Sequence, residues 1–505
     1  MIQVVCREET YIYNAYHMVK AFYPAQEVTS CVEEKASHYI TVYKDGEEIV
    51  AVEEIPGTSE DAIEIDAGKK ADIAETLRRK RKHAVDLALY DKLADCTGRT
   101  LAWGTLTGVR PTKLAMRAVE AGQEKEAFLA DFGGEYRVSR EKGELAWEIA
   151  GREKHLLDRL DLADGYSLYV GIPFCPTVCT YCSFSSGPLS DWKDSVETYV
   201  DALIKELTYL GKACEKKKLN AIYIGGGTPT TLSAGQLERL LSCIDNCFSR
   251  EYLLEYTVEA GRPDSITEEK LRVLKEHQVT RISINPQTMQ QKTLDRIGRR
   301  HSVQEVRDAV FLARELGFDN VNMDLIAGLP GESISDMEDT LAQIKELAPD
   351  SLTVHSLAVK RASKMGQKDS GEYRETIAGR EDPGREHARI SSMVQAAYAA
   401  AKEMGLVPYY LYRQKNIAGN FENVGYAKVD KAGIYNILIM EEKQSIIAAG
   451  AGASTKLVLK EEIAVPGNKK GKCTNLMRLE NVKAIDAYIR RVDEMIERKG
   501  EWLWR

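Results

Sequence analysis

The sequence predicts an α/β protein built around an incomplete (β/α)6 barrel, and two observations support this prediction. Between residues 166 and 360, six apolar segments alternate with amphipathic helical stretches, which is typical of parallel strands joined by right-handed crossovers. Polar or glycine-rich groups follow these segments, and the chemistry of such barrels lies at the C-terminal ends of the strands. We expect a partly closed, TIM-like barrel, because an open sheet would have to reverse its strand order. The strands are expected at 167–172, 219–224, 254–260, 280–285, 320–326 and 351–357.

Residues 1–160 are expected to form a separate α+β domain before the barrel. Asp45-Gly46 predicts a hairpin turn, because both turn positions favour residues that tolerate positive φ. The strands of this hairpin are expected over 38–44 and 47–53, and a long amphipathic helix is expected from Lys70 to Asp95.

The barrel domain is expected over 161–365, followed by a small α/β domain, 366–505, that is able to cover the mouth of the barrel. The polar, glycine-rich stretch 367–386 is predicted to be a loop or lid. The other expected elements are a helix over 386–404, strands near 407–413, 434–440 and 445–449, and a closing helix over 481–499.

Composition and charge narrow the possible function classes. The chain has 505 residues, of which 44% are hydrophobic and 29% charged, as in a soluble globular protein of about three domains. A net charge of -8 argues against general nucleic-acid binding, and the basic run Arg78–His83 is expected to be a solvated helix surface. The sequence shows no export signal, and no apolar stretch approaches the roughly 18 residues of a membrane helix. We therefore expect a cytoplasmic protein that binds neither nucleic acid nor a membrane.

Three cysteines, Cys175, Cys179 and Cys182, follow the first barrel strand at C-x3-C-x2-C spacing. Cytosolic cysteines are expected to be reduced, so this tight triplet predicts a ligand set rather than a disulfide source. Three thiolates can hold one face of an iron–sulfur cube and leave one iron open to a small molecule. Free thiols and a structural zinc are the alternatives, although zinc sites usually pair two C-x2-C knuckles. Cys243 and Cys247 repeat the first spacing on an amphipathic helix and are expected to be core residues.

The triplet, with an aromatic residue before its third cysteine, resembles the radical S-adenosylmethionine (SAM) superfamily. The resemblance continues along the barrel to the oxygen-independent coproporphyrinogen III dehydrogenase family. Trp103–Lys113, in a long N-terminal extension, resembles the HemZ-type branch of that family. The motifs that carry the family resemblance are Tyr169-Val-Gly-Ile-Pro-Phe-Cys175, Gly225-Gly-Gly-Thr-Pro-Thr230, Glu259, Gln287, Ile297-Gly-Arg299 and Asp324-Leu-Ile-Ala-Gly-Leu-Pro330.

This resemblance implies two cofactors, a [4Fe-4S] cluster on the three cysteines and SAM on the open iron. It implies no catalytic side chain beyond the cluster and SAM. Glycines at the site let the main chain approach a ligand closely, carboxylates accept hydrogen bonds from hydroxyl or ammonium groups, and an arginine can pair with a carboxylate. The residues implied to bind SAM are Tyr169, Tyr181, Gly226, Gly227, Thr228, Glu259, Gln287, Arg299, Asp324 and Ala358.

The resemblance also implies an enzyme of anaerobic haem biosynthesis. One electron from the cluster would split SAM into methionine and a 5′-deoxyadenosyl radical, which removes a hydrogen from a substrate propionate. Loss of carbon dioxide and an electron then leaves a vinyl group, and two such rounds turn coproporphyrinogen III into protoporphyrinogen IX. The expected partners are the tetrapyrrole substrate and a small electron-donor protein such as flavodoxin or ferredoxin. Arg110 and Arg413 are candidates to bind substrate carboxylates.

Two positions depart from the better-known branch of this family, which has a histidine and a cysteine where this chain has Gly171 and Phe184. Both departures bring the chain closer to the haem chaperones called HemW. Those relatives carry a His-Asn-x-x-Tyr-Trp segment, whereas this chain has Glu422-Asn-Val-Gly-Tyr-Ala427. A haem chaperone, or a radical SAM enzyme acting on another tetrapyrrole, is the alternative function.

Overall fold

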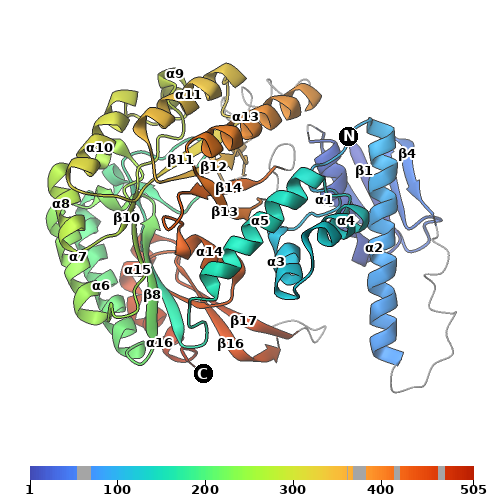
Figure 1. Cartoon of the computed structure of the whole chain (residues 1–505). Coiled ribbons are helices and arrows are strands. Elements are labelled where there is room, and N and C mark those ends of the chain that lie inside the picture. The colour runs from blue at the N-terminus through green and yellow to red at the C-terminus, as the bar shows by residue number, and fades with distance from the viewer. Residues whose placement is uncertain are drawn as a thin grey trace. The chain divides into compact units, whose positions relative to one another are not determined.

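The computed structural model describes residues 1–24, 26–53, 70–360, 362–367, 383–414, 421–464 and 473–504 (Figure 1). The chain separates into two compact units. The N-terminal unit comprises 1–150, 375–391 and 412–422, and the barrel unit comprises 151–374, 392–411 and 423–505. The three-domain division expected from the sequence stays a prediction. None of the described helices is long and apolar enough to cross a membrane.

The N-terminal unit contains β1 (Ile2–Cys6), α1 (Glu9–Phe22), β2 (Val28–Val32), β3 (Ile40–Lys44), β4 (Glu47–Val52), α2 (Lys70–Thr97), α3 (Thr112–Glu120), α4 (Lys125–Tyr136) and the start of α5 (Arg140–Leu157). Its sheet has the order β2-β1-β3-β4. Asp45 and Gly46, at φ 51° and 90°, join β3 to its antiparallel neighbour β4, which confirms the predicted hairpin. The core of this unit includes Ile2, Phe22 and Leu89, all buried.

Six parallel strands form the centre of the barrel unit and confirm the predicted ones. They are β5 (Gly165–Ile172), β8 (Lys218–Gly226), β9 (Glu255–Glu259), β10 (Arg281–Ser283), β11 (Val321–Ala327) and β12 (Ser351–Ser356), each parallel to the next. Amphipathic helices separate them and lie along the outer side of the sheet in Figure 1. These helices are α6 (Val196–Ala213), α7 (Ala234–Cys247), α8 (Glu268–Glu276), α9 (Gln291–Arg296), α10 (Val303–Glu315) and α11 (Ile334–Leu347).

Further strands extend this sheet on both sides. β15 (Ser445–Ala449) pairs in parallel with β5, and β14 (Asn423–Ala427) pairs antiparallel with β12. With β13 (Val407–Tyr412), β16 (Ser454–Ala464) and β17 (Cys473–Glu480), the order is β13-β14-β12-β11-β10-β9-β8-β5-β15-β16-β17. The barrel is therefore only partly closed, as predicted, whereas β14, β16 and β17 were not expected from the sequence.

The C-terminal part corrects two expectations. Residues 434–440, predicted as a strand, lie in the helix α14 (Ile434–Glu441), because the buried side chains of Tyr435, Leu438 and Glu441 recur every three residues and a short apolar run does not separate helix from strand. The closing helix predicted over 481–499 is interrupted at Arg491, between α15 (Ile485–Arg490) and α16 (Val492–Gly500). The predicted helix over 386–404 is confirmed by α13 (Pro383–Glu403). Most of the predicted lid, 368–382, lies outside the described residues.

Candidate functional site

The three cysteines lie in the loop that follows β5. Cys175 ends a two-residue strand, β6 (Phe174–Cys175), that pairs with β7 (Gly187–Pro188). Cys179 is buried, whereas Cys175 and Cys182 are half-buried. Backbone hydrogen bonds fix the loop, because the Thr180 N–H donates to the Ile297 carbonyl over 3.0 Å and the Cys182 N–H to the Cys179 carbonyl over 3.1 Å. Three thiols are therefore held at the C-terminal end of the first barrel strand.

Burial disfavours ionisation of the Cys175 and Cys182 thiols in the protein alone. It raises the pKa of Cys175 above its ordinary value and that of Cys182 to about 11. A bound metal reverses this tendency, because a coordinating thiol is deprotonated. Among the described residues, no group of three or more His, Cys, Asp or Glu side chains could hold a single metal ion. Three thiols on one loop suit a cluster of several irons better than a structural zinc, because structural zinc sites take four protein ligands.

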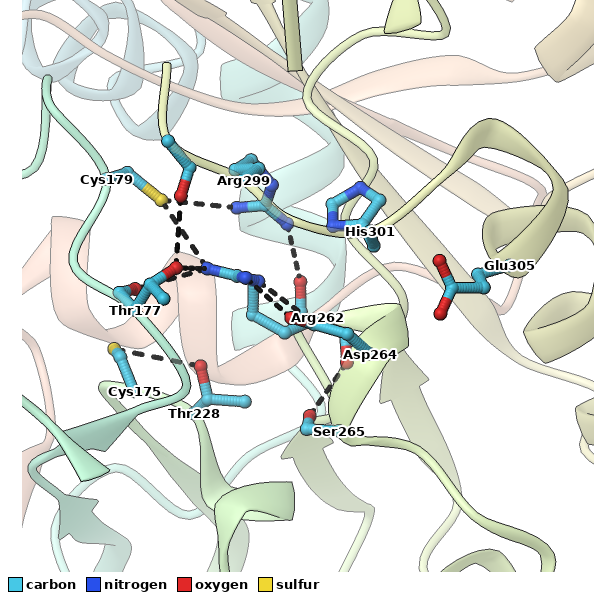
Figure 2. Close-up of polar contacts among 12 residues, drawn as sticks. Cys175, Thr177, Cys179, Thr228, Arg262, Asp264, Ser265, Arg299, His301 and Glu305 are labelled. Carbon is cyan, nitrogen blue, oxygen red and sulfur yellow. Dashed lines mark hydrogen bonds and ion pairs between the residues drawn. The ribbon is translucent and has the colours of Figure 1, made fainter. Parts of the chain in front are cut away.

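Two buried guanidinium groups converge on Cys179 (Figure 2). Nη1 of Arg262 lies 3.9 Å from the Cys179 sulfur, and Nη1 of Arg299 lies 3.8 Å from it. Arg262 also forms a two-pronged ion pair with Asp264, at 2.9 and 2.7 Å. Both cations favour negative charge on this sulfur. The sequence analysis missed Arg262, because a single arginine after a strand carries no pattern of its own.

Main-chain carbonyls orient the guanidinium of Arg299. Its Nη2 donates to the carbonyls of Gly261, at 3.0 Å, and Asn285, and its Nη1 lies 3.4 Å from the Tyr181 hydroxyl. His301, beside Arg299 in Figure 2, is fully buried, and in the described structure neither of its ring nitrogens has a hydrogen-bond partner. Burial, together with the nearby arginine charges, lowers the pKa of His301 to about 3, so this imidazole is neutral at pH 7.

The glycine turn after β8 packs directly against the cysteine loop. Gly226 has a φ of 114°, and a Cβ there would lie 2.9 Å from the Ile172 carbonyl oxygen. A Cβ on Gly227 would lie 2.5 Å from the Phe174 carbonyl oxygen and 3.0 Å from the Cys175 sulfur. Both positions need glycine for steric reasons. The turn therefore does more than connect a strand to a helix, because it lies against the first cysteine.

Two half-buried carboxyl groups, Glu259 at the end of β9 and Asp324 within β11, have opposite ionisation tendencies. Burial, with the nearby charge of Asp324, raises the pKa of Glu259 to about 7, although the Tyr223 hydroxyl donates a hydrogen bond to this carboxyl group. Burial also opposes ionisation of Asp324, but His355, whose Nε2 lies 3.8 Å from the carboxylate, and a 2.8 Å hydrogen bond from Asn322 outweigh it and lower the pKa. The site thus holds one ionised carboxylate and one carboxyl that titrates near neutral pH, an arrangement typical of functional sites.

Gln287 carries two signs of a ligand site. Its φ of 69° is unusual for a residue other than glycine, and two backbone bonds of 2.9 Å, with Asp324 and Ile326, hold it there. Its side-chain Oε1 is buried and has no hydrogen-bond partner among the described residues. Buried polar atoms are nearly always satisfied, and strained backbone gathers at ligand sites. This amide is therefore available to a bound group.

A cavity of about 310 Å³ opens beside these strand ends. The rings of Tyr169, Tyr223 and Tyr435 stack there, with centroids 6.3 Å apart for the first two and 4.5 Å for the last two. Phe184, which is 72% exposed, lies at its edge. The lining residues are Tyr169, Gly171, Ile172, Pro173, Ser183, Phe184, Ser185, Tyr223, Gly226, Glu259, Ala451, Gly452 and Ala453.

The remaining predicted residues are less closely gathered. The Thr228 hydroxyl lies 3.8 Å from the Cys175 sulfur, and Ala358 is half-buried just after β12. Arg413 and Arg110 belong to the N-terminal unit. Arg413 is buried, donates to the Leu106 carbonyl over 2.6 Å, and has a pKa lowered by burial to about 10. Its guanidinium therefore holds the loop 103–113, a structural contact that does not favour the expected role in binding substrate.

Part of the cavity wall, formed by Tyr223 and Ala451–Ala453, was not predicted from the sequence. Tyr223 lies two residues before Gly225 on the same face of β8, a signal that strand alternation could have given. Tyr435, which stacks on Tyr223 but does not line the cavity, comes from the segment wrongly predicted as a strand. Ala451–Ala453, which do line it, come from a loop far along the chain. Only the fold brings these last two to the site.

The donors present fit a [4Fe-4S] cluster and SAM. Three thiols on one fixed loop leave room for an open iron, the glycine turn admits a ligand close to the main chain, and Gln287 and Glu259 offer polar groups to it. The assignment of individual residues to SAM stays a prediction.

Comparisons with known proteins agree with this site. The model of the radical SAM superfamily matches residues 169–344. The oxygen-independent coproporphyrinogen-III oxidase-like protein HemZ of Bacillus subtilis (strain 168) is 42% identical over 381 residues, which cover 75% of this chain and 74% of HemZ. The haem chaperones HemW of Lactococcus lactis and B. subtilis are 38% and 37% identical over 38% of this chain, and the chain spans about half of their length, 49% and 51%.

Among solved structures, coproporphyrinogen III oxidase (HemN) from Escherichia coli, described as a radical SAM enzyme, has a TM-score of 0.51 at 21% identity. The match covers 68% of this chain and 72% of HemN. At this identity the likeness concerns the fold, and it confirms the predicted barrel.

Substitution of Gly227 by alanine should weaken cluster binding. The new Cβ would force the Cys175 loop to shift, and such overpacking costs about 1–3 kcal/mol, or about tenfold or more in affinity. Iron and sulfide bound per chain after anaerobic reconstitution measure this. Gly235→Ala is the control, because a Cβ there meets nothing within 4 Å. Equal iron content in both variants would contradict the packing of the turn against Cys175.

Glu259 should change its charge near neutral pH. Because its pKa is raised to about 7, the carboxyl is mostly protonated at a pH below this value and becomes a carboxylate as the pH rises through it. Difference infrared spectra should show a protonated-carboxyl band that disappears with a midpoint near pH 7 and is missing in Glu259→Gln. A band lost only near the ordinary carboxyl pKa of about 4.3 would contradict the burial of this group.

Proposed function

The chain belongs to the HemZ-like family of oxygen-independent coproporphyrinogen-III oxidase-like proteins, within the radical SAM superfamily, and we propose that it converts coproporphyrinogen III into protoporphyrinogen IX without oxygen. Two propionate side chains would lose carbon dioxide and become vinyl groups. The observation that carries this proposal is the meeting of three thiols, a glycine turn and a carboxyl of near-neutral pKa at one rim of the barrel.

Cys175, Cys179 and Cys182 would hold the [4Fe-4S] cluster, and SAM would bind at its open iron. When bound, the cluster and SAM supply one-electron chemistry that removes a hydrogen atom from an unactivated carbon. The protein's part begins with Arg262 and Arg299, whose guanidinium groups lie 3.9 and 3.8 Å from the Cys179 sulfur and would neutralise part of the charge of a thiolate-bound cluster.

Other residues would orient SAM and exclude water. Gly226 and Gly227 let the main chain contact the ligand, and the unpaired Oε1 of Gln287 would accept a hydrogen bond from it. Glu259 would accept a hydrogen bond from a ribose hydroxyl. The stacked rings of Tyr169 and Tyr223 form an apolar wall that keeps water from the reacting carbon.

The tetrapyrrole would approach from the side of Phe184. This side chain is 72% exposed at the edge of the cavity, and an aromatic ring offers a flat apolar face to a planar ligand. Each cleavage of SAM needs one electron, and each decarboxylation of the resulting substrate radical releases one electron, which a one-electron acceptor takes up. We therefore propose that a small electron-donor protein, such as a flavodoxin or ferredoxin, supplies the electron for cleavage in the cytoplasm, where the thiols stay reduced.

The alternative function, haem transfer, lacks support at one position. Where the chaperones have a histidine, this chain has Glu422, which is buried in the N-terminal unit. Its carboxylate lies 2.7 Å from Nζ of Lys142 and accepts a 2.7 Å hydrogen bond from Nε1 of Trp103. These contacts occupy the carboxylate in packing this unit, so it does not replace a haem-binding histidine.

Anaerobic turnover tests the proposed function. The reconstituted protein, given SAM, a low-potential reductant and coproporphyrinogen III, should release two molecules of carbon dioxide for each protoporphyrinogen IX formed. Cys179→Ala should lose the brown cluster absorbance and reduce the rate below detection, because an iron loses its ligand. Tight haem binding without SAM cleavage would instead support a chaperone.

Cys243→Ala is the matched control. Cys243 belongs to a second C-x3-C pair, on α7, and its sulfur lies 3.9 Å from that of Cys247. Both cysteines are half-buried and are not the core residues that the sequence predicted. Because neither belongs to the triplet, the variant should keep its iron and its rate. A full cluster in Cys179→Ala, or an empty one in Cys243→Ala, would contradict the ligand assignment.

A further inference from the structure

One wall of the cavity is built by a loop that is distant from the cluster in the sequence. Ala451, Gly452 and Ala453 follow β15 and line the cavity together with Ser183–Ser185. A Cβ on Gly452 would lie 3.9 Å from the Cβ of Ser185. Of the residues proposed for SAM, those that line this cavity, Tyr169, Gly226 and Glu259, come instead from β5, β8 and β9. The wall formed by 451–453 is therefore on the side where the substrate would approach.

A buried carboxylate on α6 holds the start of this loop. Glu206 is fully buried, and its Oε2 accepts hydrogen bonds from the Gly450 N–H, at 2.9 Å, and from the Tyr488 hydroxyl, at 2.6 Å. Nδ2 of Asn481 donates to Oε1 of Glu206 over 2.9 Å and to the Gly450 carbonyl over 2.8 Å. The backbone N–H of Gly450 is thus bound by Glu206, and its carbonyl is bound by Asn481.

The C-terminal helix α16 supplies the countercharge. Lys499 is 1% exposed, and its ammonium pairs with Oε1 of Glu206 and donates to the carbonyl of Ala448 over 2.6 Å. A buried ion pair adds little stability over an apolar packing of the same volume. The ion pair is better explained as a device that positions the loop. Lys499 binds both Glu206 and the Ala448 carbonyl, so it fixes the end of β15, where the loop begins.

The next residue of the loop has a fixing contact of its own. The buried Tyr199 hydroxyl accepts a 3.0 Å hydrogen bond from the Ala451 N–H and donates a 2.7 Å bond to the Gly171 carbonyl. A Cβ on Gly450, whose φ is 105°, would lie 2.5 Å from the Gly171 carbonyl oxygen. One hydroxyl therefore joins the wall to the end of β5, which leads into the cysteine loop.

We propose that Tyr199 and Glu206 are positioning residues that hold the loop Gly450–Ala453 at the substrate side of the cavity, with Lys499 anchoring Glu206 from the C-terminal helix. This inference rests on the proposed function, since the ligand on that side is taken to be a tetrapyrrole. Neither residue lines the cavity, so each acts through the loop and not by contact with the ligand.

Tyr199→Phe and Glu206→Gln test this proposal in the cluster-loaded protein. Each removes hydrogen bonds to the loop, and Tyr199→Phe does so without changing charge. The expected result is a rise of about tenfold in KM for coproporphyrinogen III and in Kd for coproporphyrin III, the loss expected for one hydrogen bond. Bound iron and the Kd for SAM, read from the SAM-dependent change in the cluster spectrum, should stay within about twofold.

Lys205→Met is the matched control. Lys205 and Asp493 form an ion pair of 2.6 Å between the same two helices, α6 and α16, but both side chains are more than half exposed. This variant should match the wild type in all four measurements. If only Glu206→Gln misfolds, Tyr199→Phe still decides the question.

Two results would overturn the positioning role. The first is a Tyr199→Phe variant with wild-type KM and Kd for the tetrapyrroles. The second is a variant that loses as much affinity for SAM as for the tetrapyrrole, because the substitution would then disturb the whole site and not only its substrate side. A wild-type protein that binds coproporphyrin III without turnover would contradict only the proposed function. The positioning role could still be tested by comparing the Kd values of the wild type and the variants for coproporphyrin III. A wild-type protein that binds no tetrapyrrole would contradict both.

Discussion

The parallel register of β5 and β8 is the constraint on which the rest of the site depends. Gly171 pairs with Gly225 and Ile172 with Gly226, so the two strands end together and their following loops meet. The cysteine loop continues β5, and the glycine turn continues β8. A shift of one residue would turn alternate side chains to the other face and would separate Gly227 from Cys175. The spacing between the three cysteines and the glycine turn is thus set by backbone pairing.

Buried charge is distributed unevenly over this rim, and the distribution suits two different ligands. Two guanidinium groups lie at the Cys179 sulfur, where an iron–sulfur cluster with thiolate ligands needs positive charge nearby. The carboxyl groups belong to Glu259, at the end of β9, and to Asp324, within β11. Arg262 follows Glu259 by three residues, so the end of β9 contributes to both sets of charged groups.

Local patterns in the sequence predict the frame of this site well and its walls poorly. Each of the six strands and the cysteine triplet depends on a short, contiguous segment of the sequence. The structure has all six strands where the alternation of apolar segments with amphipathic helical stretches predicted them. Tyr435 was assigned to a strand because the seven apolar-rich residues 434–440 fit either period, and Arg262 and the loop 451–453 reach the site only through tertiary contacts. Arg413 shows the reverse error, because a charged residue in a conspicuous segment is buried against the Leu106 carbonyl.

The open iron is the central claim, and electron paramagnetic resonance of the reduced, anaerobically reconstituted protein tests it most directly. Three protein thiolates leave one iron for SAM, so the predicted result is a four-iron signal whose g values change when SAM is added. A protein that gives no four-iron signal, or a signal that SAM leaves unchanged, would contradict the assignment of Cys175, Cys179 and Cys182 to a cluster with an open corner.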